Sequence, residues 1–167
     1  MLIGLIADTH IPTQRRALPP GVLRRFEGVD LILHAGDVVV EAVLAELGRL
    51  APVRAVRGNN DWTLRLPETL VVPAEELRIG MVHIRPGRID PAALFGEPVD
   101  LVVYGHTHRP ADETVDGIRW LNPGSPTSLR ISPFETGFPF RRGDGTVALL
   151  HVDGRDARFE LLPAADR

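Results

Sequence analysis

The chain of 167 residues contains no cysteine, and aromatic residues make up only 5% of it. The absence of cysteine excludes disulfide bonds and thiolate metal sites, so a bound metal would have to be held by His, Asp, Glu, Asn or water. The apolar start, Met1 to Ala7, is short, has no basic region before it and ends at Asp8. It therefore fits neither a signal peptide nor a membrane span. We expect a cytoplasmic protein with no membrane partner.

The sequence also lacks an excess of positive charge, because its formal net charge at pH 7 is −3. Surfaces that follow a nucleic-acid backbone need clustered basic residues, so we expect no stable binding of nucleic acid. A small phosphate ester can still bind through metal ions, which supply positive charge. The length and the 44% of hydrophobic residues are ordinary for one globular domain, which we expect to span residues 1–167.

The first third of the chain alternates short apolar runs with segments of helical spacing. This alternation predicts a parallel sheet with connecting helices. The expected strands are Leu2 to Ala7, Asp30 to Leu33 and Val53 to Val56, and the expected helices are Val22 to Phe26 and Glu41 to Leu50.

The second half is richer in strands, two pairs of which flank the turn signals Asp116-Gly117 and Asp153-Gly154. These hairpins predict a second, mixed or antiparallel sheet packed against the first, and Glu75-Glu76 is interpreted as the start of a solvated helix. A short helix is expected at Pro91 to Phe95. The remaining expected strands are Thr69 to Val72, Gly80 to Ile84, Asp100 to Tyr104, Glu113 to Val115, Ile118 to Leu121, Thr146 to Val152 and Ala157 to Leu162.

Ile131 to Arg142 combines Pro and Gly with closely spaced Phe residues. This composition predicts a long loop that serves as a lid or a contact surface. A homo-oligomer is one alternative, with Phe134 to Phe140 as its candidate interface.

Polar residues follow the ends of the buried strands, where ligands bind in open α/β sheets. Carboxylate, imidazole and amide groups are ligands that Mn²⁺, Fe, Ni²⁺ and Zn²⁺ accept. We expect alternate residues of an extended turn to place Asp8 beside His10 on one side, and His106 beside His108. Gly36, Gly58 and Gly105 are expected to let the backbone bend before these ligands. The full candidate ligand set is Asp8, His10, Asp37, Asn59, His83, His106 and His108.

The order of these motifs resembles the calcineurin-like metallophosphoesterases, and most closely their small YfcE-like phosphodiesterases. The matching motifs are Asp8-Thr-His10, Gly36-Asp37, Gly58-Asn59, His83 and Gly105-His-Thr-His108, followed by Asn122-Pro-Gly-Ser125. The resemblance implies two mixed β-sheets packed as a sandwich flanked by helices, in an α/β/β/α arrangement. It also implies that Asn122 to Ser125 shapes the loop under the metal site.

The resemblance implies a hydrolase of phosphate esters, with phosphodiesters as the expected class, acting through a hydroxide that bridges two divalent metal ions. Mn is the expected metal, and Fe, Ni, Co and Zn fit as well. Asp37 would bridge the ions, and Asp37 and Asn59 would be the catalytic ligands. One ion would be held by Asp8, His10 and His108, and the other by Asn59, His83 and His106.

The chain departs from the family pattern after two ligands. Asn60 stands where much of the superfamily has an acid-donating histidine, so we predict a bias toward esters with good leaving groups, or a proton supplied by water. His83-Ile-Arg85 replaces His-Gly-His. Asn60 and Arg85 are candidate substrate contacts, and Arg85 is either a phosphate clamp or a plug paired with an acidic neighbour.

Two other functions stay open at this point. The same fold occurs in a retromer subunit that acts mainly through protein contacts, so a non-catalytic scaffold is the alternative to an enzyme. A scaffold has no reason to retain seven polar ligands that are costly to bury unpaired, and this favours the enzyme. A two-metal hydrolase of a bond other than a phosphate ester is the third possibility, and the resemblance argues against it.

Overall fold

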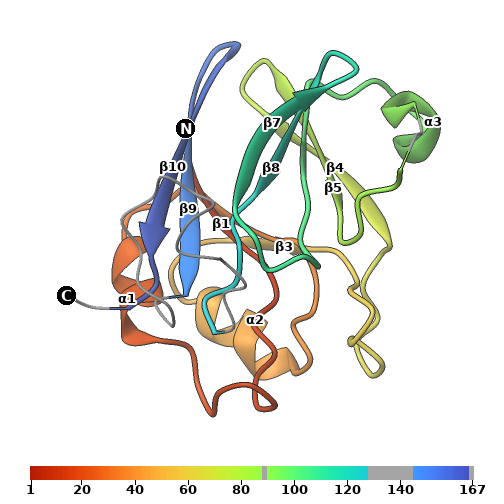
Figure 1. Ribbon diagram of the computed structural model, residues 1–167. Coiled ribbons are helices and arrows are strands. Elements are labelled where there is room, and N and C mark those ends of the chain that lie inside the picture. Colours follow the sequence, from red (N-terminus) through yellow and green to blue (C-terminus); the bar gives the residue numbers. More distant parts are fainter. Residues whose placement is uncertain (88–89, 128–144, 166–167) are drawn as a thin grey trace, which may run out of the picture.

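The computed structural model describes residues 1–87, 90–127 and 145–165, and its described strands form two sheets (Figure 1). In the first sheet β1, β2 and β3 run parallel, and α1 and α2 lie in the connections between them. Every residue of β2, and every residue of β1 after Leu2, is buried, as expected for parallel strands covered on both faces. The bounds are β1 Leu2–Ile6, α1 Pro20–Arg25, β2 Leu31–His34, α2 Glu41–Leu47 and β3 Val53–Ala55.

The hairpin of β9 (Thr146–Asp153) and β10 (Asp156–Pro163) completes the first sheet, in which β9 pairs antiparallel with β1. The order of this sheet is β10-β9-β1-β2-β3. The sequence pattern assigned this hairpin to the second sheet, and that assignment was wrong. A hairpin signal fixes which strands pair locally, but it says nothing about the sheet that the hairpin joins.

The second sheet has the order β4-β5-β6-β8-β7 and is mixed, as predicted. The strands β5, β6 and β8 run parallel, and the antiparallel strands β4 and β7 lie at its edges. The turn between β7 and β8 is formed by Asp116 and Gly117, with φ values of 51° and 83°, which suit a type I′ hairpin. The bounds are β4 Thr69–Ala74, β5 Leu77–Val82, β6 Leu101–Val103, β7 Ala111–Val115 and β8 Ile118–Asn122.

Glu75 and Glu76 form the turn between β4 and β5, so their interpretation as a helix start was wrong. Glu75 has a φ of 52°, a left-handed conformation that a helix does not use. Its carboxylate accepts hydrogen bonds at 2.5 Å from the amino group of Met1 and the backbone N–H of Gly154. These long-range contacts favour the turn over a solvated helix.

The two sheets pack face to face, and helices cover their outer faces, which confirms the predicted α/β/β/α sandwich. Ile3 and Leu5 of β1 share the buried layer between the sheets with Ile79 and Met81 of β5. The helices α1 and α2 cover the first sheet, and α3 (Pro91–Phe95) lies beside the second (Figure 1). Phe26, which directly follows α1, is the largest fully buried side chain among the described residues.

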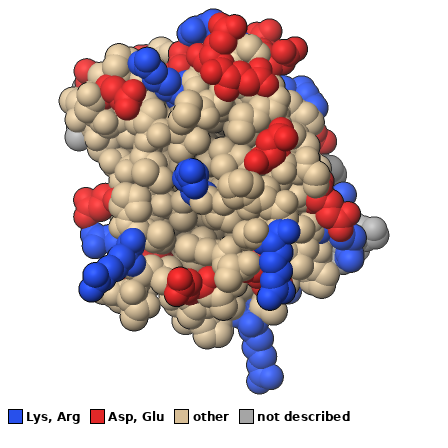
Figure 2. Space-filling view, turned by 180° about the vertical axis from the view of Figure 1, so that it is seen from behind, with Lys and Arg blue, Asp and Glu red and all other residues tan. Residues whose placement is uncertain are grey.

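Several expectations from the sequence concern the surface. The predicted loop at 131–142, with its candidate interface at 134–140, lies outside the described residues. Within the described part of the chain, no helix is both long and apolar enough to cross a membrane. On the face shown in Figure 2, basic side chains of the described residues are dispersed among acidic ones, without a continuous basic band. The absence of stable nucleic-acid binding stays a prediction.

Candidate metal centre

The candidate ligands lie at the carboxyl ends of five strands that come from both sheets. Asp8 and His10 follow β1, Asp37 follows β2, and Asn59 follows β3. In the second sheet His83 follows β5 directly, and His106 and His108 follow β6. Parallel strands end at the same edge, so the topology brings together residues that are up to about a hundred positions apart.

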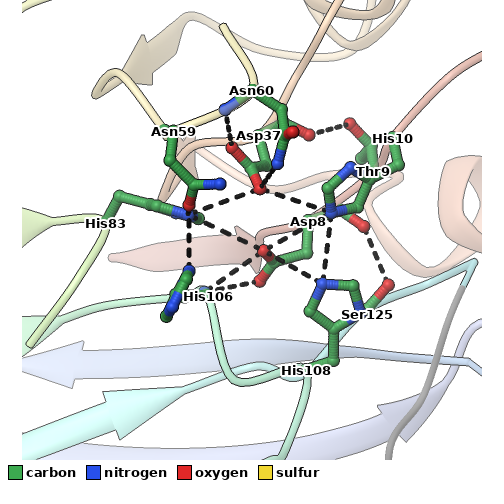
Figure 3. A network of polar contacts seen from close by, with 12 residues as sticks. Asp8, Thr9, His10, Asp37, Asn59, Asn60, His83, His106, His108 and Ser125 are labelled. Carbon is green, nitrogen blue, oxygen red and sulfur yellow. Dashed lines mark hydrogen bonds and ion pairs between the residues drawn. The ribbon is translucent and has the colours of Figure 1, made fainter.

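Figure 3 shows the carboxylates of Asp8 and Asp37 in the middle of a ring of histidines. On one side, the Nε2 atoms of His10 and His108 lie 3.1 Å apart. The Oδ1 atom of Asp8 is 3.8 Å from Nε2 of His10 and 3.5 Å from Nε2 of His108. Asp8, His10 and His108 are all buried, and they form one group of converging donor atoms.

On the other side, Asn59, His83 and His106 form a second set of converging atoms (Figure 3). The Oδ1 atom of Asn59 lies 3.0 Å from Nε2 of His83 and 2.9 Å from Nδ1 of His106. The Oδ2 atom of Asp37 is 3.5 Å from Nε2 of His83 and 3.4 Å from Nε2 of His10. Asp37 therefore reaches a histidine in each set, as a bridging ligand must.

Asp8 is more central than the sequence indicated, because it also reaches the second set. Asp8, Asp37 and His83 form the other group of converging donor atoms among the described residues. Oδ1 of Asp8 lies 4.0 Å from Nε2 of His83. The resemblance assigned Asp8 to one ion only, and it gave no reason to expect this second proximity.

The donor atoms have spacings that suit coordination to shared ions. Ligand atoms about 2.0–2.2 Å from one ion lie roughly 2.8–3.6 Å from one another when their angles at the ion are between about 90° and tetrahedral. The contacts between donor atoms within each set fall in or near that range. His83 donates its Nδ1–H to the carbonyl of Ala35 at 2.7 Å, which leaves the lone pair of Nε2 pointing at the centre. The residues present therefore fit divalent metal ions.

Five of the seven candidate ligands have left-handed backbones rather than the extended turns that the alternation argument assumed. Asp8 and His10 belong to the same set of converging donor atoms. His106 and His108 belong to different sets, because His106 contacts Asn59 and His108 contacts His10. Residues other than glycine rarely have a positive φ, and such strain concentrates at functional sites. The φ values are 55° for Asp8, 46° for His10, 56° for Asp37, 68° for His106 and 56° for His108.

The three glycines that precede ligands have different roles. Gly36, with a φ of 92°, bends the backbone as predicted. Gly58 and Gly105 also precede turns of the chain, but neither has a positive φ, so neither uses the conformation that favours glycine. They are required for space instead, because a Cβ on Gly58 would lie 2.1 Å from Oδ1 of Asp37, and one on Gly105 would lie 2.9 Å from Oδ2 of Asp8.

The site holds Asp37 as an anion beside a histidine that favours protonation. Burial raises the pKa of Asp37, but hydrogen bonds from His83 and Asn60 outweigh burial and keep that pKa well below its usual value. Burial lowers the pKa of His83, but its hydrogen bond with Asp37 and the charges of Asp8 and Asp37 outweigh burial and raise it. The raised pKa of His83 means that protons compete more strongly with a metal ion for its Nε2 atom, so metal affinity should rise with pH.

Asp61 positions two of the ligand loops, and the sequence pattern gave it no role. Its buried carboxylate accepts backbone N–H groups from Asp37 at 3.0 Å, Val39 at 2.7 Å and Gly58 at 2.7 Å. It therefore ties the loop after β2 to the loop after β3. An Asp that ends a Gly-Asn-Asn turn is a signal of such side-chain-to-backbone bonding.

The segment from Asn122 to Ser125, together with Thr127, hydrogen-bonds to the backbone of the ligand loops, as the resemblance implied for Asn122 to Ser125. The Nδ2 group of Asn122 donates to the carbonyl of Gly105 at 2.9 Å. The hydroxyl of Ser125 donates to the carbonyl of Asp8 at 2.8 Å. The hydroxyl of Thr127 donates to the carbonyl of Thr9 at 2.9 Å. These contacts fix the loops that carry Asp8 and His106 relative to one another.

His34 lies under the centre, fully buried, and is not one of the ligands. Its Nε2 is 3.2 Å from the hydroxyl of Thr9, and its Nδ1 has no hydrogen-bond partner among the described residues. Burial, together with the positive charge of His83, lowers the pKa of His34 to about 3. His34 is therefore neutral at ordinary pH and plays a structural role.

The two candidate substrate contacts are engaged with protein groups. Asn60 donates its side-chain amide to Oδ2 of Asp37 at 2.6 Å and its backbone N–H to Oδ1 at 2.8 Å. Arg85 pairs with Glu113, and its guanidinium carbon lies 5.2 Å from the ring centre of Trp120. The guanidinium would have to leave Glu113 to contact a phosphate. A role in substrate binding stays a prediction for both residues.

The sandwich and its two buried carboxylates in a ring of histidines define a metal-binding protein of the phosphoesterase type. The sequence profile of the calcineurin-like phosphoesterase superfamily domain matches residues 1–155. The chain belongs to this superfamily.

Relatives and solved structures agree with this assignment. A probable metallophosphoesterase of Methanothermobacter thermautotrophicus is 36% identical over 169 residues, which cover 97% of this chain and 92% of that protein. A phosphodiesterase of Methanocaldococcus jannaschii is 28% identical, over 97% of this chain and 99% of its own. Wild-type Vps29 from Entamoeba histolytica, complexed with Zn²⁺, is similar in structure with a TM-score of 0.72 and 25% identity, over 98% of this chain and 99% of its own.

Proposed function

We propose that the protein hydrolyses phosphodiesters with two divalent metal ions, of which Mn²⁺ is the expected native metal. The observation that carries this proposal is the convergence of seven side chains into two adjacent sets of donor atoms around two buried carboxylates. Two ions in such sites supply hydroxide near neutral pH and neutralise charge on the phosphate oxygens.

The ligands divide between two positions. Asp8, His10 and His108 would hold one ion, and Asn59, His83 and His106 would hold the other. Asp37 is the proposed bridge, because its Oδ2 atom lies at a similar distance from His10 and from His83. The mixture of nitrogen and oxygen ligands suits Mn²⁺, and also Fe, Ni²⁺, Co²⁺ and Zn²⁺.

The preference for diesters with good leaving groups has two supports. The Methanocaldococcus relative is a phosphodiesterase. The side chain of Asn60 hydrogen-bonds to Asp37, and an amide does not release a proton as an acid. Without a general acid, which contributes roughly 10²–10⁴-fold, the leaving group must be stable as an anion or take its proton from water.

The alternative proposal is a protein-interaction scaffold that uses the same fold without turnover. Its support is the structural likeness to Vps29. The buried carboxylates argue for a bound cation, because buried charge is costly unless it is paired or binds a cation. Turnover that depends on this cation separates the hydrolase from the scaffold.

The test is hydrolysis of bis(p-nitrophenyl) phosphate by chelated protein, with and without added Mn²⁺, Ni²⁺, Co²⁺ or Zn²⁺. We expect turnover that depends on the metal and is abolished in Asp37→Ala. Asp30→Ala is the matched control, because Asp30 is exposed and lies before β2, at the opposite end of that strand. If none of the four metals gives turnover, the hydrolase is wrong and the scaffold is favoured.

A further inference from the structure

A hollow opens directly beside the second set of ligands, and two of those ligands line it. Asn59 and His83 form its inner wall, and Val82 and Ile84 form an apolar side. Arg57, Gly58 and Glu68 complete the lining. The hollow therefore adjoins the place where the metal ions would hold the phosphate of a substrate.

The hollow has the size of a single ring. Its volume is about 230 Å³, and a protein cavity of roughly 150 Å³ is enough to bind benzene. The side chain of Ile84 is 47% exposed, so a large apolar surface faces solvent next to a polar centre. Exposed apolar surface beside convergent polar groups is typical of a binding site for an organic ligand.

The polar rim of the hollow carries an exposed ion pair and one backbone hydrogen bond. Nη2 of Arg57 lies 2.5 Å from Oε1 of Glu68, and the backbone N–H of Arg57 donates to the carbonyl of Pro67 at 2.7 Å. These contacts close the loop between Arg57 and Glu68. A guanidinium is planar and stacks on aromatic faces, so Arg57 adds a group to the lining that suits an aromatic ring.

We propose that this hollow binds the organic group of the phosphate ester. It selects esters with an aromatic ring close to the phosphorus, such as aryl esters, in which only the ester oxygen separates the ring from the phosphorus. The inference rests on the proposed function, because the metal ions must hold the phosphate that places the ring. Ile84 is then a specificity-determining residue, and it acts on the organic group rather than on the reacting bond.

The test compares the binding of phenylphosphonate and methylphosphonate to the Mn²⁺-loaded protein by titration calorimetry. Both probes carry the same metal-binding group, and only phenylphosphonate can fill the hollow. Removing about half of the surface of a phenyl ring from water corresponds to roughly tenfold in affinity. We therefore expect phenylphosphonate to bind about tenfold more tightly.

The variant Ile84→Ala should reduce the preference for phenylphosphonate to about threefold, because it removes most of the apolar wall. Its affinity for methylphosphonate should not change, which also shows that the variant folds and retains its metal ions. Trp62→Ala is the matched control: Trp62 is 87% exposed, lies two residues after Asn60, and is not part of the lining. This control should retain the tenfold preference.

The outcomes separate this inference from the proposed function. If the wild-type protein binds both phosphonates equally, or if Trp62→Ala lowers the preference as much as Ile84→Ala, the assignment of the hollow is overturned. If methylphosphonate does not bind the metal-loaded protein at all, the proposed phosphate site is overturned together with the hollow.

Discussion

Replacing Asp61 by Asn should weaken metal binding by loosening the loops that carry the ligands, while every ligand side chain stays in place. The carboxylate of Asp61 is only 3% exposed and accepts the backbone N–H groups of Asp37, Val39 and Gly58. An asparagine of the same shape has one acceptor oxygen. If that oxygen faces Asp37 and Gly58, the amide nitrogen faces the N–H of Val39, and two donors oppose each other.

The magnitude follows from these contacts. A hydrogen bond to a charged acceptor contributes about 1.5–3 kcal/mol, and a buried donor without a partner costs a similar amount. We expect Asp61→Asn to lower the free energy of unfolding by about 3 kcal/mol, which is roughly 10 °C in melting temperature for a chain of this size. Because the loops of Asp37 and Asn59 lose their common anchor, affinity for Mn²⁺ should fall about 10–100-fold.

The assay is a calorimetric titration of chelated protein with Mn²⁺, below the melting temperature of the variant, together with thermal unfolding. Asp30→Asn is the matched control, because Asp30 also accepts a backbone N–H, that of Leu2 at 2.6 Å, but at an exposed position away from the ligands. It should leave the affinity for Mn²⁺ unchanged. An Asp61→Asn protein that is destabilised but binds Mn²⁺ as the wild type does would refute the positioning argument.

Two further predictions concern the buried surroundings of the centre. Because the pKa of His34 is lowered from 6.5 to about 3, the unfolded chain binds more protons between these values, and stability falls as pH drops below 6.5. Wild type should lose about 2 kcal/mol more than His34→Gln between pH 6.5 and 5 in urea unfolding, and parallel pH profiles would contradict this. Gly58→Ala should lower both melting temperature and Mn²⁺ affinity, the latter more than tenfold, because its Cβ would overlap Asp37. Gly87→Ala is its control, with nothing within 4 Å of the new Cβ, and equal metal affinities in the two variants would contradict the steric argument.

The residue types of the centre could be predicted from the sequence, because strand ends are readable locally. A buried apolar run such as that before Asp8 ends where the first polar residue appears, and parallel strands share one edge. The same local reasoning gave the turn at Asp116-Gly117, where two adjacent residues require a positive φ. It failed for Glu75, whose turn is held by Met1 and Gly154, both distant in sequence.

Contacts between loops could not be predicted, because they too join residues that are distant in sequence. The role of Asp61 depends on Val39 and Gly58 lying within 3 Å of one carboxylate, and nothing in the spacing of these residues requires it. The pairing of Arg85 with Glu113 likewise joins β7 to the segment after β5. The sequence left an acidic partner open as one alternative for Arg85, but it did not identify which acid.

The left-handed backbones at the ligands connect stability to function. A residue in such a conformation costs on the order of 1–3 kcal/mol, so five of them cost a sum comparable to the whole stability of a domain. They persist because the loops hold one another: Asp8 donates its N–H to the carbonyl of Gly36, and His10 donates its own to the carbonyl of Asp37. Glycine at these positions would relieve the strain but would remove the donor atoms. The strain is retained at the positions where side chains from five strands must point toward one another.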